Sequence, residues 1–218
     1  MRDPFYKFML ITHRQQISLP AYLRFIEQCV ASGAGITSVQ LREKKASFQE
    51  LLPFASELHA LLKSYQIPLI INDNIKLALE IDAEGVHLGQ TDGSPVQARQ
   101  VLGANKLLGL SIESEEELVR ANNYELNYIA ASAVFASKHK HNLRRLWGID
   151  GVRELARCSL HPIVAIGGIH QLNVIEVLSA GAKGIAVIEA LHDAEEPAVM
   201  ARKLRYLIEG REYAGVNE

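Results

Sequence analysis

The sequence predicts an α/β protein with a closed (β/α)8 TIM barrel, formed as one compact domain by residues 1–218. Short apolar runs alternate with longer segments of helical periodicity, in eight repeats at even spacing. The runs are continuously apolar, which is typical of parallel strands covered by helices on both faces. The chain is somewhat shorter than the roughly 250 residues usual for this barrel. An open doubly wound sheet is the competing architecture, and the count and spacing of the repeats favour the barrel.

The predicted strands are the apolar runs themselves. Branched apolar residues dominate runs such as 68–72 and 162–166, and such residues favour strands. Parallel strands need a crossover connection, which the helical segments between the runs provide. The eight predicted strands lie at residues 8–12, 36–41, 68–72, 85–89, 106–111, 128–131, 162–166 and 184–188.

The predicted helices follow from apolar spacing and from start signals. The first begins near Pro20 and ends at the glycine-rich stretch 33–35. Ser47 and Ser114 are each followed three residues later by glutamate, the spacing of a capping box at a helix start. The tail after Gly210 is expected to fray. The other predicted helices are a short one through 77–79 and segments near 94–102, 149–157, 171–180 and 197–208.

Composition and charge exclude several classes of protein. The 23 lysines and arginines nearly balance the 25 aspartates and glutamates, whereas a general nucleic-acid binder usually has a strongly basic domain. Cys29 and Cys158 lie far apart, which argues against a zinc cluster or a disulfide framework. No apolar stretch approaches the roughly 18 residues of a membrane span, and the N-terminus lacks a signal-peptide core. We therefore expect a cytoplasmic protein without nucleic-acid or membrane partners.

Polar residues follow the predicted strands at their carboxyl ends, where barrel enzymes place their active sites. Any one of them is more typical of a solvated turn, and Asn72 to Asn74 could be a turn with a helix cap. His87 lies within a strand and is more typical of a hydrogen-bonded core histidine. The polar residues in question are Gln40, Arg42, Glu43, Lys44, Asn72, Asp73, Gln90, Asp92, Ser111, Ser137, Lys138, His139, Lys140, Gly167, Gly168 and Glu189.

The combination of these residues indicates a specific chemistry. Asp73 and Asp92 end adjacent strands, and a small number of carboxylate ligands suits Mg²⁺ that also binds water and substrate phosphates. Positive charge for phosphate oxygens comes from Arg42, Lys44 and Lys140. The glycine pair at 167–168 lets backbone N–H groups approach a phosphate closely. The residues therefore predict a metal-dependent enzyme that binds a diphosphate at one side and a monophosphate at the other.

Four segments resemble the signatures of the thiamine-phosphate synthase (thiamine-phosphate pyrophosphorylase) family. They are QLREK at 40–44, INDN at 71–74, GVHLGQTD at 85–92 and VAIGGI at 164–169. The similarity extends from about residue 8 to 207 with the segments in the family's order. The second and third segments are specific, whereas the glycine pair of the fourth is shared by many phosphate-binding barrels.

The resemblance implies a transferase of thiamine biosynthesis with small phosphorylated substrates and Mg²⁺ as cofactor. It joins 4-amino-5-hydroxymethyl-2-methylpyrimidine diphosphate to 4-methyl-5-(β-hydroxyethyl)thiazole phosphate, giving thiamine phosphate and diphosphate by a dissociative mechanism. Asp73 and Asp92 would hold the metal. Gly168, Ile188 and Glu189 would lie at the thiazole phosphate. The residues implied at the pyrimidine diphosphate and the diphosphate it releases are Gln40, Arg42, Lys44, Asn72, Ser111, Ser137, His139 and Lys140, of which Arg42, Lys44, Ser111 and Lys140 are the catalytic candidates.

The sequence departs from the family at three places. The stretch 137–140 reads Ser-Lys-His-Lys where the family has Thr-x-Thr-Lys, so His139 replaces a hydroxyl residue. The segment 130–134 lacks the usual glycines. Glu189 stands where the family has a serine that donates to the thiazole phosphate. Because like charges repel, we expect either that Glu189 turns away, that a cation compensates it, or that the second substrate differs; weak thiazole phosphate binding is our hypothesis.

Three other functions stay open on the sequence. A thiazole tautomerase relative shares the barrel, but that activity relies on a histidine where this chain has Glu113, and it tends to lose the carboxylates that Asp73 and Asp92 retain. A non-catalytic barrel that binds phosphorylated ligands is the second. Another phosphate-handling barrel enzyme is the third and rests on fold analogy alone. The sequence also leaves open whether the chain forms a homo-oligomer.

Overall fold

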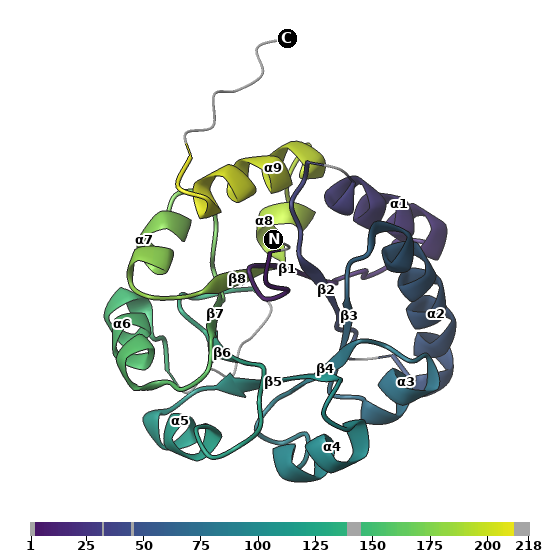
Figure 1. Cartoon of the computed structure of the whole chain (residues 1–218). Helices are drawn as coiled ribbons and strands as arrows, with labels where there is room; N and C mark the ends of the chain where they lie inside the picture. The colour runs from purple at the N-terminus through teal and green to yellow at the C-terminus, as the bar shows by residue number, and fades with distance from the viewer. Residues whose placement is uncertain (1–2, 32, 45, 139–144, 212–218) are drawn as a thin grey trace.

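The computed structural model describes residues 3–31, 33–44, 46–138 and 145–211. Its eight strands form a closed parallel barrel in which each strand pairs with the next along the chain and β8 pairs with β1 (Figure 1). The predicted fold class is confirmed. The strands are β1 (Phe8–Ile11), β2 (Ser38–Leu41), β3 (Leu69–Asn72), β4 (Gly85–Leu88), β5 (Leu107–Ile112), β6 (Tyr128–Ser132), β7 (Ile163–Ile166) and β8 (Gly184–Val187).

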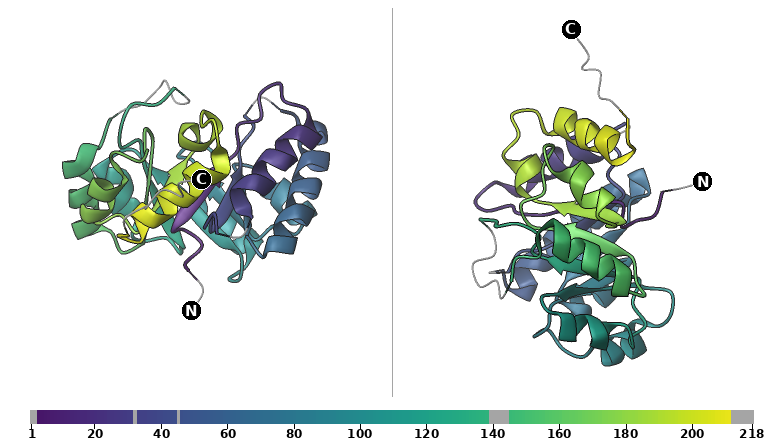
Figure 2. Two further views of the ribbon diagram at one scale, coloured as in Figure 1. Left: turned by 90° about the horizontal axis from the view of Figure 1, so that it is seen from above. Right: turned by 90° about the vertical axis from the view of Figure 1, so that its left-hand side faces the viewer.

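Helices surround the barrel as a ring, and Figure 2 shows the same arrangement from two further directions. Each predicted helix is present, with ends that differ by up to three residues from the prediction. The helices are α1 (Leu19–Val30), α2 (Phe48–Tyr65), α3 (Ile75–Glu80), α4 (Pro95–Leu102), α5 (Glu115–Ala121), α6 (Gly148–Cys158), α7 (Val174–Ser179), α8 (Glu189–His192) and α9 (Pro197–Ile208).

Side-chain caps explain where several helices begin. Ser47 accepts a hydrogen bond from the backbone of Glu50, whose carboxylate accepts one from the backbone of Ser47, so the predicted capping box is complete. At α5 the box is only half formed. Ser114 accepts from the backbone of Glu117, but the Glu117 carboxylate accepts from the backbone N–H of Glu113 instead, at 2.6 Å.

Two helix assignments differ from the prediction. Helix α7 begins at Val174 rather than at residue 171, because Asn173 closes a turn after β7. Its side chain accepts from the backbone of His170 and donates to the carbonyl of Gly168. The sequence analysis missed α8, because its four residues are too short to show an apolar period.

The apolar core lies in two layers. A small cluster fills the inside of the barrel and includes Met9, Ile70, Tyr128 and Val164. A larger cluster lies between the strands and the surrounding helices. Both strand faces are therefore buried, which explains why the strands read as continuous apolar runs rather than as alternating ones.

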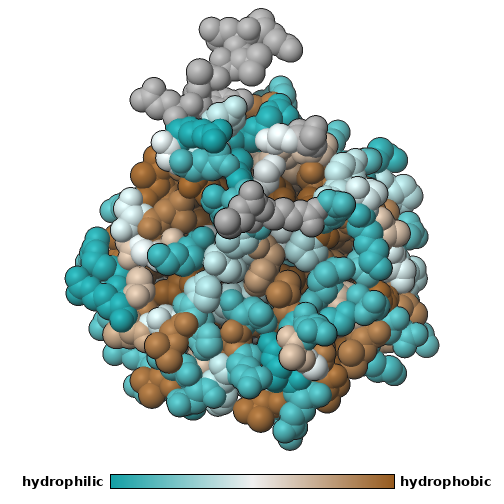
Figure 3. All heavy atoms as spheres, in the orientation of Figure 1, coloured by the Kyte–Doolittle hydropathy of each residue, from teal (hydrophilic) through white to brown (hydrophobic). Residues whose placement is uncertain are grey.

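The outer surface mixes residues of both kinds. On the face shown in Figure 3, hydrophilic and hydrophobic side chains are interspersed. Among the described residues, no helix has the length and apolar composition needed to cross a membrane. Cys29 is buried in α1 and Cys158 is exposed at the end of α6, and both thiols are free.

Candidate active site

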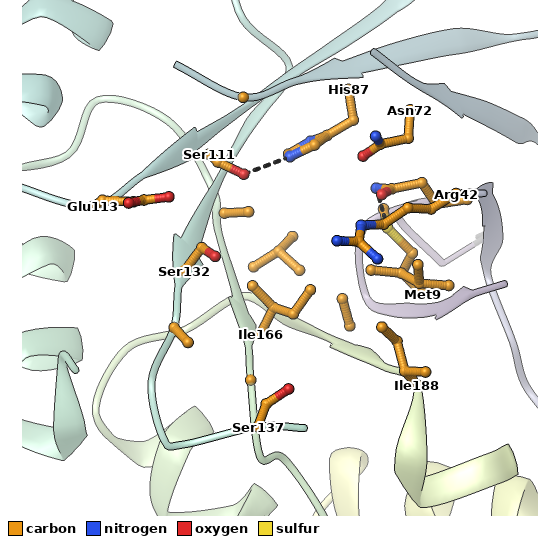
Figure 4. A pocket seen from close by; sticks show the side chains of 18 of the residues that line it. Met9, Arg42, Asn72, His87, Ser111, Glu113, Ser132, Ser137, Ile166 and Ile188 are labelled. Atoms are coloured by element: carbon orange, nitrogen blue, oxygen red, sulfur yellow. Dashed lines mark hydrogen bonds between the residues drawn. The ribbon is translucent and has the colours of Figure 1, made fainter. Parts of the chain in front are cut away.

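A cavity of about 470 Å³ opens at the carboxyl ends of the strands. It brings together every predicted site residue that the structure describes. Figure 4 shows the side chains of some of them, among them Arg42, Asn72 and Ser111, pointing into it from different strands. His139 and Lys140 lie outside the described residues. The predicted residues that line the cavity are Gln40, Arg42, Lys44, Asn72, Asp73, Asp92, Ser111, Ser137, Gly168, Ile188 and Glu189.

Asp73 and Asp92 form an acidic pair at one side of the cavity. Asp73 follows β3 with a backbone φ of 64°, and its N–H donates to the carbonyl of His87 at 2.8 Å. Asp92 accepts a hydrogen bond from the backbone of Gly89 at 2.8 Å. Burial and the neighbouring Asp92 carboxylate raise the pKa of Asp73 to about 6. Two carboxylates held this close are stabilised by a cation between them.

The donor set of this pair fits Mg²⁺. Asp73 and Asp92 supply hard oxygen ligands, which magnesium prefers. Within the described residues no group of three or more His, Cys, Asp or Glu side chains is placed to hold a metal. Water and substrate phosphate oxygens would complete its coordination, as is usual for magnesium in phosphate-handling sites.

Arg42 and Lys44 place positive charge next to the acidic pair. Both cations lower the pKa of Asp73, against the larger effects of burial and Asp92. Burial lowers the pKa of Arg42, while the charges of Asp73 and Glu43 raise it. The Arg42 backbone donates to Thr12 at 2.9 Å, which fixes the start of this loop against β1. The rim therefore combines cations that could bind phosphate oxygens with carboxylates that could hold a metal.

The floor of the cavity is a hydrogen-bonded layer inside the barrel. His87 is buried, and its ring nitrogens lie 2.9 Å from the Tyr128 hydroxyl and 2.9 Å from the Ser111 hydroxyl. His87 is thus the hydrogen-bonded core histidine that the sequence favours, and it also faces the cavity. Sequence reasoning missed Met9 and Tyr128, because residues inside a barrel strand cannot be distinguished from those facing the helices when both faces are apolar.

The opposite side of the cavity is formed by the turn after β7 and the start of α8. Gly167 and Gly168 have φ values of 94° and 61°. A Cβ atom at Gly168 would lie 2.7 Å from the carbonyl oxygen of Ala136, so the turn requires glycine. The Glu189 carboxylate accepts a hydrogen bond from the backbone of Lys138 at 2.8 Å.

The geometry around Glu189 bears on whether its carboxylate turns away from the expected thiazole phosphate and on whether a cation compensates its charge. The carboxylate is turned toward the segment that follows β6. The Lys138 ammonium pairs with Asp193 at 3.3 Å, so it is directed to another carboxylate. Within the described segment, Glu189 is held by a backbone N–H group.

Comparison with known proteins matches this arrangement to one family. A sequence model described as thiamine monophosphate synthase matches residues 8–191. The chain is 44% identical to the thiamine-phosphate synthase of Chlamydia abortus over 209 residues, covering 96% of this chain and 98% of the relative. It is 40% identical to the thiamine-phosphate synthase of Vibrio campbellii over 199 residues, covering 91% and 96%.

The chain belongs to the thiamine monophosphate synthase family. Its barrel also superimposes on the solved thiamine phosphate pyrophosphorylase from Pyrococcus furiosus with a TM-score of 0.84 and 30% sequence identity, covering 94% of this chain and 96% of that one. The family resemblance that the sequence signatures indicated is therefore confirmed. The match over residues 8–191 covers both sides of the cavity, Glu189 included.

Proposed function

We propose that this chain joins 4-amino-5-hydroxymethyl-2-methylpyrimidine diphosphate to 4-methyl-5-(β-hydroxyethyl)thiazole phosphate and releases diphosphate. The observation that carries the proposal is the acidic pair Asp73 and Asp92 beside Arg42 and Lys44, in one cavity with the glycine turn at 167–168. Membership of the family and identity above 40% to a synthase over 96% of the chain support it. Glu113 at the position of the tautomerase histidine favours the synthase over the isomerase.

The reaction requires charge stabilisation more than a protein nucleophile. The bond between the pyrimidine methylene carbon and the diphosphate oxygen breaks, and its electron pair leaves with the diphosphate. The thiazole nitrogen then donates its lone pair to the methylene carbon, which gives thiamine phosphate. Arg42 and Lys44, joined by Lys140 in the proposal, bind the departing oxygens, and the closed barrel floor orients the two rings. Mg²⁺ held by Asp73 and Asp92 would supply further positive charge to the diphosphate.

The remaining substrate contacts follow from position. We assign Gln40, Asn72 and Ser111 to the pyrimidine diphosphate because they line the cavity on the side of the acidic pair. Gly168, Ile188 and Glu189 are assigned to the thiazole phosphate on the other side, where backbone N–H groups can reach its oxygens. In chain order, Ser137 lies between the residues assigned to the pyrimidine diphosphate and those assigned to the thiazole phosphate. It would contact the released diphosphate together with His139.

The proposal places the reaction in the cytoplasm. Cys29 and Cys158 are both free thiols, which fits a reducing compartment. The partners it implies are small phosphorylated molecules only.

A coupling assay tests the proposed function. Purified protein is mixed with both phosphorylated substrates and Mg²⁺, and thiamine phosphate is followed with time, with Asp92→Ala as the control. We expect turnover by the natural chain and its loss in the variant. Magnesium-dependent binding of the pyrimidine diphosphate without turnover would instead identify a non-catalytic phospho-ligand-binding barrel.

A further inference from the structure

A chain of three hydrogen-bonded side chains forms part of the cavity floor. The Tyr128 hydroxyl is 2.9 Å from Nδ1 of His87. Nε2 of His87 is 2.9 Å from the hydroxyl of Ser111 (Figure 4). Tyr128 is 1% exposed and His87 5%, and both line the cavity together with the less buried Ser111. The chain of bonds therefore runs from the fully buried interior of the barrel to a hydroxyl at the substrate surface.

The barrel is built around this arrangement. His87, Gly109 and Tyr128 are paired at one level of three adjacent strands. A Cβ atom at Gly109 would lie 2.2 Å from the Tyr128 ring and 2.6 Å from Nδ1 of His87, so only glycine leaves room for both rings. The rings stack with centroids 5.4 Å apart. Ser111 lies two residues after Gly109 on β5 and thus points to the same interior face.

The partners of Tyr128 fix the direction of the hydrogen bonds. The amide nitrogen of Gln40 lies 3.4 Å from the sulfur of Met9, which can only accept. The Gln40 side chain acts on the Tyr128 hydroxyl as well and lowers its pKa, against the larger effect of burial. Burial raises the pKa of Tyr128, so the phenol keeps its proton. Nδ1 of His87, at 2.9 Å, lies in reach as the acceptor of this buried proton, and a buried O–H group left without an acceptor would be costly.

We propose that Tyr128 and His87 are positioning residues that hold Ser111 as a hydrogen-bond donor toward the substrate. Nδ1 of His87 accepts from Tyr128, so the neutral imidazole carries its proton on Nε2 and donates it to the oxygen of Ser111. The Ser111 proton is then directed into the cavity, toward an acceptor such as a ring nitrogen. The reverse direction would make Ser111 donate to His87 and leave only its oxygen to face a substrate N–H group.

The tautomer of His87 is measured directly by nitrogen NMR on protein labelled at its eight histidines. The His87 signals are assigned from their loss in His87→Asn and, independently, as those that move in Tyr128→Phe. We expect the Nε2–H tautomer in the natural chain. An Nδ1–H tautomer would overturn the proposal. This measurement uses no substrate, so its outcome is separate from that of the proposed function.

A double-mutant cycle tests the role of the relay in turnover, which rests on the proposed function. Tyr128→Phe keeps the stacked ring and removes the proton donor, and we expect it to lower kcat/KM about tenfold, in line with one hydrogen bond. In a Ser111→Ala background the same change should have almost no further effect, because the relay then has no hydroxyl to orient. Equal effects in both backgrounds would show a purely structural role and overturn the proposal.

A matched control removes a tyrosine hydroxyl elsewhere. The Tyr65 hydroxyl donates to Glu27 at 2.9 Å on the helical surface, far from the cavity lining. Tyr65→Phe should leave kcat/KM and the His87 signals unchanged. If the natural chain shows no turnover, binding of the pyrimidine diphosphate replaces kcat/KM in the cycle, with the same expected non-additivity. Additive losses of affinity would again overturn the relay.

Discussion

Asp73 is the residue whose titration most directly reports the state of the acidic pair. Its pKa of about 6 in the folded protein lies above the ordinary value of 3.8, because it is buried next to Asp92. In metal-free protein the charged pair therefore destabilises the fold above pH 6. This cost is relieved progressively as the pH falls from about 6 to 3.8, because in that range the folded state holds a proton that the unfolded state has lost.

Asp92→Asn should relieve this repulsion. Without metal, we expect its free energy of unfolding at pH 7.5 to exceed that of the natural chain by about 1 kcal/mol, the scale of two charges ~4 Å apart in a well-solvated setting. This difference in the free energy of unfolding should be smaller at pH 5.5. Urea unfolding in the presence of a chelator at the two pH values measures it. Asp150→Asn, at an exposed ion pair of α6, should show no such dependence. A variant less stable than the natural chain at pH 7.5 would contradict the expectation.

Glu189 carries a negative charge to the side of the cavity assigned to the thiazole phosphate. Glu189→Ser should lower the KM for the thiazole phosphate about fivefold, which corresponds to a repulsion of about 1 kcal/mol. The KM for the pyrimidine diphosphate should not change. Asp193→Asn removes a charge just beyond the same short helix and serves as the control. An unchanged or higher KM for the thiazole phosphate in Glu189→Ser would refute the weak-binding hypothesis.

At the scale of single elements, the sequence predicted helix starts best where a local capping signal marks the same boundary as the tertiary packing. The capping box of Ser47 and Glu50 marks the start of α2 without reference to the rest of the fold. Helix α7 was placed too early, because the hydrogen bonds of Asn173 to His170 and Gly168 depend on the turn after β7. The four-residue α8 has too few residues to produce a period.

The turn after β7 should be sensitive to substitution at Gly168. Gly168→Ala would put a side chain on a backbone with a φ of 61° and place its Cβ atom 2.7 Å from the carbonyl oxygen of Ala136. We expect a loss of about 2 kcal/mol in the free energy of unfolding, from strain and displacement together. The KM for the thiazole phosphate should rise as the turn shifts.

Gly210→Ala provides the comparison for backbone strain alone. Gly210 has a φ of 68°, and a Cβ atom there would meet nothing within 4 Å. It should lose about 1 kcal/mol with both KM values unchanged. Equal losses of stability in the two variants would show that the contact with Ala136 is unimportant.

At the scale of the whole molecule, the repeat count was sufficient to predict the barrel, and the strand ends were sufficient to predict the rim of the cavity. The layer beneath the rim was not predictable from the same pattern. His87, Gly109 and Tyr128 meet only because β4, β5 and β6 are in register. Their juxtaposition depends on long-range pairing, which leaves no trace in the local composition of any one strand.

A substitution at the amino end of the barrel should lower stability without changing catalysis, because active sites lie at the carboxyl end. Arg205 of α9 lies at the other end, where its guanidinium bonds the carbonyl of Gly35 at 3.2 Å and pairs with Asp3 and Glu209. Arg205→Ala should lower the free energy of unfolding by about 2 kcal/mol, since charged hydrogen bonds are lost from a side chain that is 13% exposed.

The same Arg205→Ala variant should retain the natural kcat/KM for both substrates at 25 °C, because none of the groups it contacts lines the active-site cavity. Urea unfolding and steady-state kinetics on one preparation measure both quantities. Arg153→Ala, which removes an exposed partner of Asp150, should change neither by more than about 0.5 kcal/mol. A fall in kcat/KM for Arg205→Ala without loss of stability would mean that the two ends of the barrel are energetically coupled, and that closure through β1 and β8 transmits the change to the cavity.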